Sequence, residues 1–138
     1  MPQSNGWVGV DLDGTLAVYD KWRGVFHIGA PIPQTVDLVK SLLEEGIEVR
    51  IFTARVQEGS DAIEAIIRWC AEHIGVILPV TDRKDFSMVY MVDDRAVAVE
   101  RNTGRFLTAI PSVESIKAHW DVKKGAPDPK EFKRDTVV

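Results

Sequence analysis

Short apolar runs alternate with longer stretches of helical periodicity along most of this chain. Trp7–Val10 is continuously apolar, as is typical of a parallel strand that is covered on both faces. Glu48–Phe52 alternates between polar and apolar residues and is rich in β-forming types, so it also predicts a strand. Two further apolar runs complete the set, and the predicted strands are Trp7–Val10, Glu48–Phe52, Val76–Leu78 and Met88–Val92.

Helix signals lie between these runs. Pro33 suits the first position of a helix and Gly46 suits its end, which predicts a helix over about Pro33–Glu45. Ser60 is a suitable N-cap for a second helix that continues to about Ile74. The remaining predicted elements are a strand pair, Ala96–Glu100 with Arg105–Thr108, and a final helix from Ser112 to about Trp120.

The alternation of strands and helices predicts an α/β fold with a mainly parallel sheet. The expected architecture is a single-domain, Rossmann-like three-layer sandwich. Residues 1–120 would form this domain. The charged segment 121–138 contains few apolar residues, and we expect it to be a poorly ordered tail or to pack on a partner.

Composition narrows the class of protein only a little. The chain has 138 residues, of which 45% are hydrophobic and 28% are charged, values that are ordinary for one globular domain. A net charge of −4 argues weakly against nucleic-acid binding by bulk charge. Cys70 is the single cysteine, so an internal disulfide is excluded. No signal peptide or membrane span is visible, and we expect a cytoplasmic protein.

Six polar residues share a position just beyond a predicted strand or on a loop that connects two strands. They are Asp11, Asp13, Thr53, Lys84, Asp93 and Asp94. The carboxyl ends of parallel strands meet at one edge of a sheet, and ligands bind in the crevice there. We therefore expect these side chains to gather into one acidic pocket that also holds a lysine.

Several carboxylates in one crevice repel each other unless a cation offsets their charge. Oxygen ligands without His or Cys suit Mg²⁺, which usually binds one or two carboxylates, waters and a substrate phosphate. Gly14 permits a turn that brings Asp13 to the far side of a bound phosphate. Asp11 can then attack while Asp13 handles a proton. The pattern predicts Mg²⁺-dependent phosphate chemistry.

Plainer interpretations stay open for most of these residues. Thr53 could be a helix cap or a turn residue, and the Asp93-Asp94 pair could be an ordinary turn at a strand end. Arg83 could take the role given to Lys84, or both could be surface charges. Arg55 could reach a substrate phosphate or pair with an acid.

Taken as an ordered set, these residues resemble the haloacid dehalogenase (HAD) superfamily of phosphatases. The four motifs appear in the expected order: Asp11-Leu12-Asp13-Gly14-Thr15, Thr53, Lys84 and Asp93-Asp94. The resemblance covers roughly residues 7–98 and implies the HAD-type version of the predicted fold. An aspartate at position 13 favours the phosphatases and phosphomutases of that superfamily over its ATPases and dehalogenases.

The resemblance implies a role for each motif residue. Asp11 would attack phosphorus and form an aspartyl-phosphate, and Asp13 would protonate the leaving oxygen and then activate water. Thr53 would hydrogen-bond the phosphoryl group, and Lys84 would neutralise charge. The implied Mg²⁺ ligands are the Asp11 carboxylate, the Asp13 main-chain carbonyl, Asp94 and, directly or through water, Asp93.

Members of this family often carry a cap domain, but the segments 15–33 and 53–84 are too short to hold one beside the core elements. We expect no separate cap domain and an open site. That site suits a phosphorylated small molecule or an extended phosphorylated ligand, or a lid from a neighbouring subunit of a homo-oligomer. The predicted substrate-binding residues are Gly14, Thr15, Trp22, Arg23, Ala54 and Arg55. The loop that carries Trp22 and Arg23 could equally pack on the core.

Two rival functions remain. A phosphotransferase or phosphomutase would use the same residues, but it must exclude water, which an open site does poorly. A non-catalytic phosphate-binding regulatory module, such as a signalling receiver domain, also uses carboxylates, Mg²⁺, a Thr and a Lys. In a receiver domain the acidic pair follows the first strand and the phosphorylated aspartate lies mid-chain, which is the reverse of the order here.

Overall fold

The computed structural model describes residues 5–123 of the chain. Its elements in order are β1 (Trp7–Val10), α1 (Pro33–Glu44), β2 (Glu48–Phe52), the 3₁₀ helix η1 (Ala54–Glu58), α2 (Ser60–His73), β3 (Val80–Thr81), β4 (Met88–Val92) and α3 (Val113–Lys123). The chain divides into two compact units, which are described separately. The first comprises Met1–Tyr19 and Arg23–Asp94, and the second comprises Asp20–Trp22 and Arg95–Val138.

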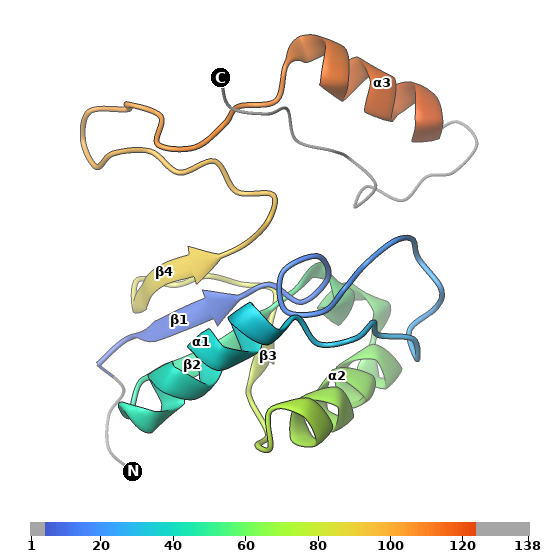
Figure 1. Cartoon of the computed structure of the whole chain (residues 1–138), viewed down its shortest axis with the longest axis vertical. Coiled ribbons are helices and arrows are strands. Elements are labelled where there is room, and N and C mark those ends of the chain that lie inside the picture. Colours follow the sequence, from blue (N-terminus) through green and yellow to red (C-terminus); the bar gives the residue numbers. More distant parts are fainter. Residues whose placement is uncertain (1–4, 124–138) are drawn as a thin grey trace. The chain divides into compact units, whose positions relative to one another are not determined.

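The first unit is built on a four-stranded sheet in the order β3-β2-β1-β4. Every neighbouring pair is parallel, with Val8 beside Val49 and Val10 beside Ile51 in the central pair. Figure 1 shows β1 and β4 running side by side in the same direction. The predicted α/β fold with a parallel sheet is therefore confirmed, and three of the four strands have the predicted bounds.

The hydrophobic core lies on the face of the sheet that α1 and α2 cover. Side chains at alternate positions of β1 and β2 point toward it, because successive residues of a strand face opposite sides. Each fully buried Val, Ile or Leu contributes roughly 1.5–3 kcal/mol relative to an exposed one. The main core residues are Val8, Val10, Val49 and Ile51 from the sheet, Val36 and Val39 from α1, and Ile66, Trp69 and Cys70 from α2.

The opposite face of the sheet carries Trp7 and Arg50. The chain crosses this face between the end of β3 and the start of β4, in the crossover segment (residues 82–87). The guanidinium carbon of Arg50 lies 4.4 Å from the centre of a Trp7 ring. The sheet therefore lies between a helical layer and an extended crossover, and the two faces meet different kinds of structure.

The predicted strand Val76–Leu78 is wrong. The third strand is Val80–Thr81, which pairs with Ile51 and Phe52 of β2. Leu78 is buried in the core but Ile77 is exposed, so these residues connect α2 to the sheet without joining the ladder. Pro79 has no amide hydrogen and takes part only through its carbonyl, which accepts a hydrogen bond from the Ile51 amide at 2.8 Å.

Helix ends differ slightly from the prediction. α1 begins at Pro33 as expected, and the chain turns at Gly46, which has a φ of 78°. α2 begins at Ser60, but Ser60 is its first residue and not its cap. The capping position is taken by Gly59, which has a φ of 96° and no side chain to accept a hydrogen bond.

The second unit contains a turn and α3. The predicted strand pair reduces to one antiparallel bridge, between Val99 and Phe106, closed by a hydrogen bond from the Glu100 amide to the Arg105 carbonyl at 2.7 Å. The turn forms where predicted, because Asn102 takes a φ of 66° there. Within residues 95–112 no strand continues on either side of this bridge.

The last described helix extends beyond its predicted end. α3 continues to Lys123, three residues past the expected end at about Trp120. The rest of the predicted tail lies outside the described residues, so the domain boundary at residue 120 stays a prediction. Within residues 5–123, no helix combines the length and the apolar character that crossing a membrane would require.

Candidate functional site

The site begins where the strands end. The Asp11 amide, one residue past β1, donates to the Val92 carbonyl at 2.9 Å. The Thr53 amide, one residue past β2, donates to the Thr81 carbonyl at 2.9 Å. These bonds continue the ladder for one further residue, so the backbones of Asp11 and Thr53 are held by the sheet itself. Both side chains are buried.

A tight turn follows Asp11. The Leu12 carbonyl accepts hydrogen bonds from the amides of Leu16 and Ala17, each at 2.9 Å, while the side chains of Leu12 and Leu16 enter the core. Gly14 lies at the turn with a φ of 86°, in the left-handed region that favours glycine. A Cβ at this position would lie 2.6 Å from Oδ2 of Asp94. The predicted turn is present, and the glycine is needed for both its conformation and its lack of a side chain.

Three carboxylates gather beside this turn. Oxygen atoms of Asp11, Asp93 and Asp94 all lie within 4.8 Å of one another. Asp11 is buried, Asp93 is half-buried and Asp94 is exposed, so the cluster opens to solvent on one side. Two unit charges about 4 Å apart repel by roughly 4 kcal/mol at an effective dielectric constant of about 20. Charged carboxylates at this spacing favour a bound cation.

The hydroxyl of Thr15 links the two ends of the cluster. Its Oγ1 lies 3.0 Å from Oδ1 of Asp94 and 3.4 Å from Oδ2 of Asp11, and it accepts the Asp94 amide at 2.9 Å. Thr15 was predicted to bind substrate. In the structure its hydroxyl contacts the Asp94 and Asp11 carboxylates, and a contact with substrate stays a prediction.

Asp13 points to a different partner from Asp11. Its two carboxylate oxygens accept hydrogen bonds from Nε and Nη2 of Arg55, at 2.7 and 2.8 Å. The side chains of both residues are less than a tenth exposed. Of the two interpretations of Arg55, the structure shows the pairing with an acid. The sequence does not indicate which acid, because 42 residues separate the two positions.

Thr53 stands between β2 and η1. Its Oγ1 accepts a hydrogen bond from the Arg55 amide at 3.1 Å. Thr53 therefore caps η1, which is the helix-cap role that the sequence allowed. This bond uses an oxygen lone pair and leaves the hydroxyl hydrogen available to donate to a phosphoryl oxygen. That donation stays a prediction. Ala54 is exposed at the start of η1.

The crossover segment carries Arg83 and Lys84, both exposed. The Thr81 hydroxyl fixes the backbone here, because it accepts the Arg83 amide at 3.1 Å and lies 3.3 Å from the Arg83 carbonyl. In the described part of the chain, no ion pair joins Lys84 to the acidic cluster. The electrostatic role of Lys84 stays a prediction, with Arg83 as its alternative.

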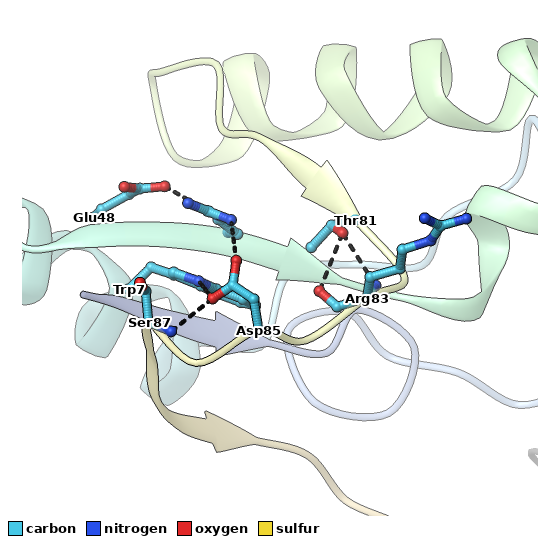
Figure 2. A network of polar contacts seen from close by, with 7 residues as sticks. Trp7, Glu48, Thr81, Arg83, Asp85 and Ser87 are labelled. Carbon is cyan, nitrogen blue, oxygen red and sulfur yellow. Dashed lines mark hydrogen bonds and ion pairs between the residues drawn. The ribbon is translucent and has the colours of Figure 1, made fainter. Parts of the chain in front are cut away.

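Asp85 anchors the crossover segment to the sheet, as Figure 2 shows. Its Oδ1 accepts the indole N–H of Trp7 at 2.9 Å and the amide of Ser87 at 2.8 Å. Its Oδ2 lies 3.6 Å from Nη1 of Arg50, whose Nε also donates to Glu48 at 2.5 Å. The hydrogen bond from Trp7, followed by that from Ser87, lowers the pKa of Asp85 below its usual value.

The return segment (residues 24–31) leads the chain back toward α1. The Gly29 carbonyl accepts the indole N–H of Trp69 at 3.0 Å, and the Ala30 carbonyl accepts the Val18 amide at 2.8 Å. A Cβ at Gly29 would lie 1.9 Å from the Val18 carbonyl oxygen, so this crossing requires glycine. The segment is therefore tied both to α2 and to the chain that leaves the turn.

The two loop residues predicted to bind substrate are both exposed. Arg23 is exposed at the edge of the first unit, just before the return segment. Trp22 belongs to the second unit. Substrate contacts by either residue stay predictions.

Comparison with known proteins adds support for the fold. No family model matches the chain, and no curated protein matches it. A solved structure of a conserved protein from Bacteroides thetaiotaomicron is similar, with a TM-score of 0.50 and 24% sequence identity over 87% of this chain and 93% of that chain. At this identity the likeness bears on the α/β fold alone.

Proposed function

We propose that this chain is a Mg²⁺-dependent phosphomonoester hydrolase that acts through an aspartyl-phosphate on Asp11. The observation that carries the proposal is the convergence of the Asp11, Asp93 and Asp94 carboxylates within 4.8 Å, at the ends of two neighbouring parallel strands. The motif resemblance to the HAD superfamily supports the same assignment.

The donor set suits a hard divalent cation. Asp11, Asp93 and Asp94 offer only oxygen atoms, and the main-chain carbonyl of Asp13 would add a fourth oxygen. When bound, Mg²⁺ would neutralise the carboxylates and draw a phosphate dianion to them. Thr15 would hold the Asp11 and Asp94 carboxylates in position, as an outer-shell hydrogen-bonding residue does in other metal sites.

The chemistry divides between the two aspartates of the turn. In the first step a carboxylate oxygen of Asp11 attacks phosphorus, and the bond from phosphorus to the ester oxygen breaks. Asp13 gives a proton to the departing oxygen, so the alcohol leaves neutral. In the second step Asp13 takes a proton from a water molecule, which attacks phosphorus, releases inorganic phosphate and restores Asp11. The Thr53 hydroxyl would donate to a phosphoryl oxygen during both steps.

The main test is the Asp11→Asn variant. Asparagine keeps the shape of the side chain but removes the nucleophilic charge, so we expect phosphate release to be lost while thermal unfolding stays cooperative. Release of inorganic phosphate from p-nitrophenyl phosphate with Mg²⁺ measures this. Asp37→Asn, an exposed aspartate on α1, is the matched control and should retain activity. Retained activity in Asp11→Asn would exclude Asp11 as the nucleophile.

The same assay separates hydrolysis from phosphate transfer. Inorganic phosphate and phosphorylated acceptor are measured together in the presence of an added alcohol. We expect free phosphate to account for the phosphate removed from the substrate, because the segments 15–33 and 53–84 are too short to add a cap domain that would exclude water. A phosphorylated small molecule, an extended phosphorylated ligand and a cytoplasmic setting remain part of the proposal.

A further inference from the structure

Arg55 makes three hydrogen bonds from one buried guanidinium group. Nε and Nη2 donate to the two carboxylate oxygens of Asp13 at 2.7 and 2.8 Å, and Nη2 also donates to the His27 carbonyl at 3.0 Å. The side chain is 5% exposed. Arg55 therefore connects the proposed acid/base carboxylate to the return segment.

The backbone of Arg55 is held as firmly as its side chain. Its amide donates to Oγ1 of Thr53 at 3.1 Å, and Thr53 is bonded in turn to the end of β3. The sheet therefore fixes the backbone position from which the Arg55 guanidinium reaches Asp13. A two-point bond between guanidinium and carboxylate sets the plane and direction of the carboxylate, which a lysine ammonium cannot do in the same way.

We propose that Arg55 is a positioning residue, which orients the Asp13 carboxylate for proton transfer and does not bind the substrate phosphate. This inference rests on the proposed function. Both nitrogens that face Asp13 are used in the pair, Nη2 is also used by His27, and the third nitrogen, Nη1, is buried away from solvent. The contact with His27 makes the orientation of Asp13 depend on the return segment, so a residue outside the strand-end motifs contributes to the acid/base group.

The test compares two substrates that differ in their need for a proton donor. Phenyl phosphate releases a poor leaving group and needs the acid, whereas 2,4-dinitrophenyl phosphate releases a good one and does not. The value of kcat/KM reports the steps up to the departure of the leaving group, in which Asp13 acts as the acid. We expect Arg55→Lys to lower kcat/KM for phenyl phosphate by about 10- to 100-fold and for the dinitrophenyl ester by less than about 3-fold.

A double-mutant cycle asks whether Arg55 acts through Asp13. Asp13→Asn, Arg55→Lys and the double variant are compared on phenyl phosphate. We expect the double variant to be no slower than Asp13→Asn alone, because the positioned group is already lost. Equal losses on both substrates, or additive losses in the cycle, would show that Arg55 binds phosphate directly and would overturn the inference.

Trp69→Phe is the matched control for the return segment. It removes the hydrogen bond to Gly29 but leaves the Arg55–Asp13 pair in place. We expect a much weaker leaving-group dependence than that of Arg55→Lys, because both hydrogen bonds from Arg55 to Asp13 remain. A leaving-group dependence as strong as that of Arg55→Lys would assign the effect to loosening of the return segment and would contradict a specific role for Arg55.

Folding and function are checked separately. Circular dichroism and thermal unfolding show whether Arg55→Lys is folded. If it is not, Arg55→Gln, which keeps an N–H donor toward Asp13, replaces it with the same expectation. A wild-type protein that releases no phosphate from either ester would contradict the proposed function and this role with it. An active wild type whose Arg55 variants lack leaving-group dependence contradicts only the role of Arg55.

Discussion

Thr15 and Asp94 make a reciprocal contact across 79 positions of sequence. The Asp94 amide donates to Oγ1 of Thr15 at 2.9 Å, and the same Oγ1 lies 3.0 Å from the Asp94 carboxylate. This contact fastens the turn after β1 to the end of β4. The acidic cluster therefore keeps its spacing through the Thr15 hydroxyl, which can both donate and accept a hydrogen bond.

Removal of Mg²⁺ should abolish phosphate release, and its return should restore it, because the carboxylates and a phosphate repel one another without a cation. Mg²⁺ at about 100 times its Kd should also stabilise the folded protein by roughly 2.7 kcal/mol, measured as a rise in Tm. Asp94→Asn should weaken this rise, and Asp37→Asn should not. Full activity in a chelator would rule out the metal assignment.

Gly14→Ala should lower stability and Mg²⁺ affinity by more than the positive φ angle of Gly14 alone would explain. Both Gly14 and Gly75 have positive φ angles, 86° and 95°, but only Gly14 has atoms where a Cβ would lie. We expect Gly75→Ala to lower the free energy of unfolding by about 1–2 kcal/mol through backbone strain alone. Gly14→Ala should cost more and should reduce Mg²⁺ affinity by about 10-fold or more through displaced Asp94. Equal effects on Mg²⁺ affinity would contradict the steric explanation.

Asp85→Asn should be less stable than the wild type at neutral pH, since it removes a charged acceptor from Trp7 and Arg50. The pKa of Asp85 lies below its ordinary value of 3.8 in the folded protein, mainly because Trp7 donates to the charged form. A carboxyl of this kind adds stability above its unfolded-state pKa and loses that stability as the pH falls through the folded-state pKa. The difference between the variant and the wild type should therefore shrink below pH 3.8.

Urea unfolding at a series of pH values measures this difference. Asn can still accept the indole N–H of Trp7, so the comparison isolates the charge and not the hydrogen bond. A difference that stays constant across the acidic range would show that Asp85 contributes no charge-dependent stability.

Cys70 should be inert in the folded protein. Its thiol, on α2, is fully buried in the hydrophobic core, and burial raises its pKa to about 12. The reactive thiolate is therefore rare at neutral pH and shielded from reagents. A colorimetric thiol reagent at pH 8 should label the native protein only as fast as the protein unfolds to expose Cys70. The same reagent should label the protein rapidly in denaturant. Fast labelling without denaturant would mean that α2 does not stay packed on the sheet.

The elements with strong local signals were predicted well. Trp7–Val10, Glu48–Phe52 and Met88–Val92 have the predicted bounds. The first two lie inside the sheet, where strands must be continuously apolar or alternate, whereas Met88–Val92 is a partly exposed edge strand whose apolar run was still long enough to be recognised. Val76–Leu78 was wrong because a short apolar run does not say whether its backbone pairs. Here Pro79 withholds an amide, and the ladder begins only at Val80.

The sequence by itself determined that acidic residues follow parallel strands, since strand ends and their order along the chain are local properties. It could not decide which partner each carboxylate takes. Asp11 joins Asp93 and Asp94, while Asp13, two residues away, turns to Arg55. Only the tertiary structure sets this division, because the turn at Gly14 sends neighbouring side chains in different directions and the ends of β2 and β4 bring their partners from distant parts of the chain.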